Sequence, residues 1–188
     1  MAIVRDLFGG AIKLPVNNSF LDASQIRQVP DNQEVFVDMN TQQSLIIELL
    51  EPVEHEHEDA AKFHFQQLAE DNDALSYEVH SIERLNPVTT APHLPSETTL
   101  VYLLQGSQQV AKFNEAKENA YNTVAITMMV IRLKQVTTDL VISMNAPVAV
   151  APGSSEQPST TNDLTAVAQD MMGMISQLKI EDWGLFGA

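Results

Sequence analysis

Alternating apolar and polar positions predict two neighbouring strands in the first third of the chain. Residues 34–38 alternate, with Val35 and Val37 opposite Phe36, and residues 44–50 form an apolar run that only Glu48 interrupts. Both patterns are typical of β-strands. A short polar connection over residues 40–43 indicates that the two strands pair. A further alternating stretch over residues 75–85 predicts a strand with one exposed face.

Two segments show the longer period of a helix. Ala61, Phe65 and Leu68 fall at i, i+4 and i+7 and predict a helix over about residues 56–70 that begins in acidic residues. Near the C-terminus an apolar stripe predicts a second amphipathic helix, which Thr161, Asn162 or Asp163 would cap. Its members are Leu164, Val167, Met171, Met174, Ile175 and Leu178.

The middle of the chain is dominated by predicted strands with short connections. Residues 98–105 and 108–113 flank Gly106 and Ser107, a hairpin signal. Residues 122–134 and 139–147 predict two long strands, whereas residues 86–95 and 151–161 are predicted loops. This order predicts an α+β fold in one domain over residues 1–188: a mostly antiparallel sheet covered by helices.

Charge and composition limit the classes of partner that the protein can bind. The 188 residues carry a formal net charge of −15, which opposes binding to nucleic acid and to anionic membrane surfaces and favours a basic protein partner. Cysteine is absent, which excludes disulfides and thiolate chemistry and fits a reducing compartment. No signal peptide, membrane span or basic nuclear localisation signal is present in the sequence.

A proline-led acidic turn precedes the first predicted strand. Pro30 favours a turn, and Asp31 and Asn32 stabilise turn geometry through bonds from their side chains to the backbone. We expect Asp31 and Glu34 to lie close together at a sheet edge. Arg27 either holds Asp31 through an intramolecular ion pair or contacts a partner's carboxylate.

The same region resembles a known family, the Ran guanine nucleotide release factors. The resemblance extends over nearly the whole chain, and the order of its motifs is more specific than any one of them. The motifs are LFGGAI at 7–12, DASQIR at 22–27, QVPDNQEVF at 28–36, QSLIIELLE at 43–51, IRL at 131–133, TDLVISMN at 138–145 and LFG at 185–187.

The resemblance implies a fold, a function and a site. It implies a PsbP-like α/β/α sandwich, with helices on both faces of an antiparallel sheet, and a protein that binds the GTPase Ran and promotes release of its guanine nucleotide. It also implies that the protein supports nuclear import and is present in the nucleus and also in the cytoplasm. It further implies a protein that uses no covalent catalysis, cofactor or metal. A Ran-binding protein is a possible further partner, and we expect a monomer. Carried over by motif, the site is Asp31 and Glu34, with Asp22, Arg27 and Glu51 as neighbours.

The sequence also allows two other functions. An acidic adaptor would hold a basic protein without affecting nucleotide exchange. A metal-dependent enzyme would use His55, His57 and His64, of which His57 and His64 are seven residues apart and could share a helix face, but zinc-binding spacings such as His-Glu-x-x-His are absent. No hydrolase elbow and no phosphate-binding glycine motif occurs. We expect Leu185 and Phe186 to pack onto the core, and Trp183 could pack or form an interface.

Overall fold

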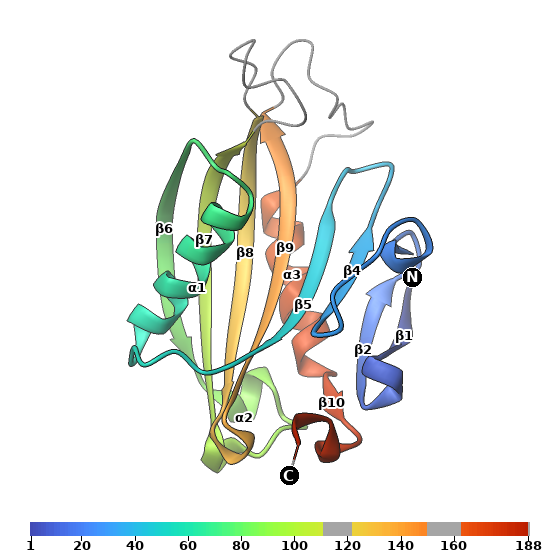
Figure 1. Cartoon of the computed structure of the whole chain (residues 1–188), viewed down its shortest axis with the longest axis vertical. Coiled ribbons are helices and arrows are strands. Elements are labelled where there is room, and N and C mark those ends of the chain that lie inside the picture. The colour runs from blue at the N-terminus through green and yellow to red at the C-terminus, as the bar shows by residue number, and fades with distance from the viewer. Residues whose placement is uncertain (111–121, 150–162, 188) are drawn as a thin grey trace.

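A computed structural model describes residues 1–110, 122–149 and 163–187. Its main element is an antiparallel sheet of seven strands among these residues, in the order β3-β4-β5-β9-β8-β7-β6 (Figure 1). The strands of this sheet are β3 Leu21–Asp22, β4 Gln33–Val37, β5 Ser44–Leu50, β6 Ser76–Leu85, β7 Thr99–Val110, β8 Asn122–Leu133 and β9 Thr138–Ala149.

Helices cover both faces of this sheet. Successive residues of a strand point to opposite faces, so neighbouring residues of one strand contact different helices. Helix α1, Glu58–Asp71, packs its Phe65 onto one face, which carries Met128 and Val130. Helix α3, Leu164–Ser176, packs onto the other face, which carries Met129 and Ile131. The predicted antiparallel sheet between helices is therefore confirmed, as are the two amphipathic helices (Figure 1).

A smaller antiparallel sheet lies beside the large one. It has the order β1-β2-β10, with β1 Ala2–Leu7, β2 Ile12–Asn17 and β10 Lys179–Ile180, so it contains a segment from each end of the chain (Figure 1). The residues after β10 return to the core, where Trp183, Leu185 and Phe186 pack as partly buried side chains. The predicted packing of Leu185 and Phe186 is confirmed, and Trp183 packs with them.

Asp163 caps α3, one of the three residues predicted for this role. Its Oδ1 accepts hydrogen bonds from the backbone N–H groups of Thr165 and Ala166, at 3.0 and 3.2 Å.

The segment 86–95, predicted as a loop, contains the short helix α2, Pro87–Thr90. Asn86 caps this helix by accepting from Val88 N–H at 3.0 Å, and Pro87 at its start needs no N–H partner.

The hairpin predicted at Gly106 and Ser107 is wrong. These residues lie inside one continuous strand, β7, where Gly106 pairs with Val79 of β6 on one side and with Ile126 of β8 on the other. The glycine is explained by packing: a Cβ atom there would stand 2.5 Å from the Glu78 carbonyl oxygen and 2.8 Å from Phe65 Cζ. The residue thus makes room for α1 and does not form a turn.

Gly106→Ala is therefore expected to destabilise the fold by about 1–3 kcal/mol, because the backbone of Glu78 and the ring of Phe65 must move to admit the methyl group. Gly173→Ala is the matched control. At Gly173, inside α3, nothing lies within 4 Å of the Cβ position, so alanine is expected to raise the stability by up to about 1 kcal/mol. Urea unfolding measures both changes, and equal effects would contradict this account.

The predicted loop over residues 151–161 lies outside the described residues, as do 111–121, 150, 162 and 188. In the described part of the chain, no helix combines the length and the apolar character needed to cross a membrane.

Candidate functional site

The acidic turn lies at the start of β4. Strand β3 pairs only with Phe36 and Val37, so Glu34 lies on the part of β4 that β3 leaves uncovered. Asp31 is exposed and precedes the strand, whereas Glu34 is only partly exposed. The turn therefore presents one exposed carboxylate and one that is half-buried at an open stretch of the sheet.

Glu34 joins this turn to the glycine motif near the N-terminus. Its Oε1 accepts a hydrogen bond from Phe8 N–H at 2.8 Å, across 26 positions of sequence. Phe8 has a φ of 52°, a backbone conformation that is unfavourable for a residue with a side chain. Glu34 therefore stabilises a strained turn as well as contributing charge, and its hydrogen bond joins the motifs at 7–12 and 28–36 in this fold.

Electrostatics connects Glu34 with Asp22. Burial raises the pKa of the Glu34 carboxyl above its ordinary value of 4.5, the hydrogen bond from Phe8 opposes this, and the Asp22 carboxylate raises it further. Asp22 also caps the 3-10 turn Ala23–Gln25 by accepting from Ser24 N–H at 2.9 Å. The structure thus places Asp22 and Glu34 in one negative environment.

Asp31 and Glu51 lie at the same end of the β4–β5 pair. Asn32 O accepts from Leu49 N–H at 2.9 Å, and Asn32 Nδ2 donates to Leu49 O at 3.2 Å. Asp31 and Glu51 lie beyond this link, at the same end of the two paired strands, and both are exposed. Of the predicted site residues, Asp22 and Glu34 therefore lie on β3 and β4, and Asp31 and Glu51 lie just outside β4 and β5.

Arg27 does not hold Asp31 in place. Its side chain is exposed, and among the described residues no hydrogen bond or ion pair joins it to Asp31. The backbone closes the acidic turn instead, since Gln33 N–H donates to Pro30 O at 3.0 Å. Of the two alternatives for Arg27, the ion pair with Asp31 is wrong, and the side chain is exposed.

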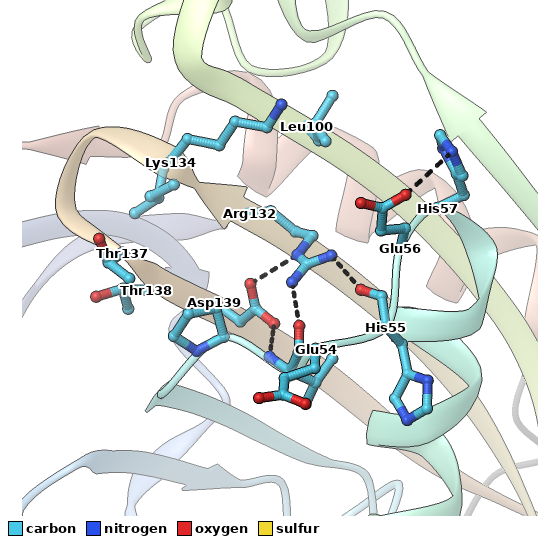
Figure 2. A pocket seen from close by; sticks show the side chains of 13 residues that line it. Glu54, His55, Glu56, His57, Leu100, Arg132, Lys134, Thr137, Thr138 and Asp139 are labelled. Carbon is cyan, nitrogen blue, oxygen red and sulfur yellow. Dashed lines mark hydrogen bonds and ion pairs between the residues drawn. The ribbon is translucent and has the colours of Figure 1, made fainter.

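A second polar centre lies at the connection between β5 and α1. Arg132 of β8 donates from Nη1 to His55 O and from Nη2 to Val53 O, both at 2.7 Å (Figure 2). Its Nε donates to Asp139 Oδ1 at 3.0 Å. This network attaches residues 52–57, which we call the strap, to the sheet. The strap borders a pocket of about 470 Å³ that Lys134, Thr137 and Thr138 also line (Figure 2).

Asp139 is the centre of the network and is fully buried. Its Oδ2 lies 2.8 Å from His64 Nε2, which comes from α1 and is also buried. The buried carboxylate therefore has both Arg132 and His64 as partners, as buried charge requires. One polar cluster thus links α1, the strap, β8 and β9.

The geometry also corrects the reading of His57 and His64 as a shared helix face. Helix α1 begins at Glu58, so His57 precedes it and is exposed, while His64 points inward to Asp139. In the described ranges no group of three or more His, Cys, Asp or Glu side chains is arranged to hold a metal ion.

Sequence reasoning missed the roles of Arg132 and Asp139, although both lie in motifs that carry the resemblance. A signal was available: the two residues are seven apart across a predicted hairpin, and the structure shows them as direct cross-strand partners. Opposite charges at paired positions of an antiparallel hairpin stabilise the pairing. Their role in holding the strap could not be read from spacing, because it depends on contacts with Val53 and His55.

Glu48 of β5 supplies a pH test of this part of the fold. Burial raises the pKa of its carboxyl above the ordinary value of 4.5, the hydrogen bond from Gln33 opposes this, and the Asp71 charge raises it further. Between 4.5 and the raised pKa the folded state holds a proton that the unfolded chain has lost, so stability falls as pH rises through this window. Glu48→Gln should remove that loss, since glutamine still accepts from Gln33.

We therefore expect Glu48→Gln to be more stable than wild type at pH 7, with the two proteins converging at pH values below 4.5. Urea unfolding over a pH series measures the difference. Glu97→Gln is the control for loss of one charge, because Glu97 is outside this cluster. A wild-type protein that is the more stable one at neutral pH would contradict the assignment.

Comparisons with known proteins show what this chain is similar to. Residues 5–147 match the family described as Ran-interacting Mog1 protein. The Ran guanine nucleotide release factor of Danio rerio is 38% identical over 184 residues, covering 97% of this chain and 99% of that protein. The nuclear import protein mog1 of Schizosaccharomyces pombe is 36% identical over 168 residues, covering 88% of this chain and 86% of that protein.

The fold is also found among solved structures. The crystal structure of the Saccharomyces cerevisiae Ran-binding protein Mog1p superposes with a TM-score of 0.71 at 28% identity, covering 100% of this chain and 99% of that one. The family is described by its interaction with Ran and not by a catalysed reaction. Because the family match covers most of the chain and the relatives are similar along almost their whole length, this protein belongs to the family of Ran-interacting Mog1 proteins.

Proposed function

We propose that this protein binds the GTPase Ran and promotes release of its guanine nucleotide, in support of nuclear protein import. The observation that carries the proposal is the similarity to the Ran guanine nucleotide release factor of Danio rerio, which is 38% identical over 97% of this chain. A relative named for nuclear import supports the second part. The protein would then act by binding, without covalent chemistry, and would be present in the nucleus and also in the cytoplasm. A Ran-binding protein is a further candidate partner.

The proposed contact surface is the outer part of β3, β4 and β5. Asp31 and Glu34 are its centre, with Asp22, Arg27 and Glu51 as neighbours. In favour of this surface, Asp31 and Glu51 are exposed at the same strand ends, and Asp22 contributes to the field at Glu34. Arg27 has no ion-pair partner among the described residues, which leaves it available for a carboxylate on Ran.

Electrostatics would bring the two proteins together. A protein with a net charge of −15 attracts a basic face, and clustered carboxylates orient the partner during encounter. Because Glu34 is held by Phe8, it would enter the interface with its position already set, which reduces the entropy lost on binding. Apolar contacts around the carboxylates would supply much of the remaining affinity.

Release of nucleotide requires differential binding. The protein must bind nucleotide-free Ran, or Ran with displaced loops, more tightly than nucleotide-loaded Ran, since equal affinity for both states shifts no equilibrium. We infer that the carboxylates compete for the lysine or the magnesium ion that holds the phosphates in a GTPase. Equal measured affinities for the two forms of Ran would eliminate this mechanism.

The decisive experiment follows dissociation of a fluorescent GTP analogue from preloaded Ran. Addition of this protein is expected to accelerate dissociation, because stabilising the nucleotide-free state lowers the barrier to its formation. A parallel binding measurement by calorimetry tells the outcomes apart. If the protein binds Ran but leaves the dissociation rate unchanged, it is an acidic adaptor, and absence of binding would overturn the proposal as a whole.

A further inference from the structure

A groove of about 640 Å³ lies between the small sheet, the β4–β5 connection and α3. Val4 of β1 forms one wall and is largely exposed, and Asp38 lies at the start of the β4–β5 connection. Buried Met144 of β9 and Met174 of α3 form its apolar base. Its volume is within the range of protein pockets that bind ligands. The groove shares none of its lining residues with the acidic turn.

Two carboxylates, those of Asp38 and Asp170, are the charged groups among the described residues that line the groove. Asp38 is buried, and the donors that its carboxylate has among the described residues are neutral: Ser19 Oγ at 2.8 Å, Asn40 N–H at 2.9 Å and Thr41 N–H at 3.3 Å. Asp170 on α3 is exposed and has no ion pair within the described residues. Among the described residues that line the groove, none is Lys, Arg or His. A cationic group on an occupant would complement the charge of this lining.

Gly173 gives a second and independent indication. It lies inside α3, where glycine is the poorest residue apart from proline, and it is exposed along the groove. Nothing in the described structure comes within 4 Å of the position of a Cβ atom, so packing within the protein does not require a glycine there. A residue without a side chain does allow another chain to approach the helix backbone closely.

Strand β1 and two glutamine side chains of α3 indicate that the groove suits an extended peptide segment. Among the described residues β1 pairs only with β2, so it is an edge strand, and edge strands commonly receive extended segments. Gln169 and Gln177 of α3 line the opposite side. Their amide groups can both donate to and accept from the peptide groups of an extended chain.

We propose that this groove binds an extended segment of a partner protein in which lysine or arginine alternates with apolar residues. The basic side chain lies beside Asp38 and Asp170, the apolar one packs on Met144 and Met174, and the segment's backbone approaches Gly173. Methionine side chains adapt to apolar groups of different shape, so the base of the groove accepts several aliphatic residues. This site is separate from the proposed Ran surface and requires no Ran.

The test uses the isotope-labelled full-length protein and a blocked peptide of alternating valine and lysine, followed by amide NMR shifts at physiological salt. Saturable shifts are expected at Val4, Gly173 and Gln177, and a peptide with glutamate in place of lysine should produce none. Gly173→Leu fills the groove without changing charge and should weaken binding at least about tenfold. Asp170→Lys should have an effect of similar size.

Glu83→Lys is the matched control, since Glu83 is exposed on β6 and outside the groove while the charge change equals that of Asp170→Lys. It should leave the affinity nearly unchanged. Equal weakening by Asp170→Lys and Glu83→Lys, with no effect of Gly173→Leu, would mean attraction by net charge alone and would overturn the proposal. Absence of saturable shifts would also overturn it. If Gly173→Leu does not fold, the comparison of the two lysine variants decides.

Discussion

Asp139→Ala is expected to lower the free energy of unfolding by about 3–5 kcal/mol, because it leaves one buried charge of a pair without its partner. Asp139 is fully buried between Arg132 and His64, and only 14% of the Arg132 side chain is exposed. Removing the carboxylate takes away the acceptor of Arg132 Nε and the partner of His64 Nε2 together. Urea unfolding followed by circular dichroism measures the loss.

The matched control is Asp6→Ala, which removes an exposed carboxylate paired with Lys13. Ion pairs in contact with solvent contribute about 0–1 kcal/mol, so this change should be small. Hydrogen exchange gives a second readout, since release of Arg132 should increase exchange at the amides of the strap before global unfolding. An Asp139→Ala variant as stable as Asp6→Ala would show that the buried network contributes little.

Charge reversal of the acidic turn, Asp31→Lys with Glu34→Lys, is expected to weaken Ran binding about 100-fold or more and to abolish accelerated nucleotide release. Placing lysine against a basic surface replaces attraction by repulsion, and like charges in contact cost several kcal/mol. A 100-fold loss corresponds to about 2.7 kcal/mol. Calorimetry with nucleotide-free Ran and the fluorescent release assay measure the two effects.

Two single variants separate charge from structure in this test. Asp31→Lys changes an exposed side chain, so it should reduce binding without changing stability. Glu34→Gln removes the charge but keeps an oxygen that can accept from Phe8 N–H, so the turn at residues 8–10 should remain intact. Glu83→Lys again controls for net charge. Full activity of the double variant, with its fold preserved, would place the Ran surface elsewhere.

Local patterns predicted most elements, because the positions that must be apolar repeat with the period of each element. The i, i+4, i+7 spacing at Ala61 gave α1 within about two residues, and alternation gave the paired strands β4 and β5. The failure at Gly106 has a definite cause. A glycine followed by serine is a turn signal locally, but Phe65 of α1 needs the space above a straight strand.

Local sequence patterns also predicted part of the candidate site. The turn at Asp31 and the half-open edge at Glu34 follow from Pro30 and from the strand that begins after it. The hydrogen bond from Phe8 to Glu34 joins residues 26 positions apart, and the contact of His64 with Asp139 joins residues 75 apart. No periodicity reports contacts over such separations.

By itself the sequence determined the sign of the charge, the antiparallel pairing of successive strands, the two amphipathic helices and the family to which the chain belongs. These properties depend on composition, on local period and on motif order, all of which are present in the linear chain. Only the tertiary structure decided that Glu34 supports the turn at Phe8, that Arg132 and Asp139 hold the strap, and that Asp38, Asp170 and Gly173 border one groove. These arrangements arise when the two faces of the sheet are buried, because burial brings distant polar groups together and requires each to find a partner.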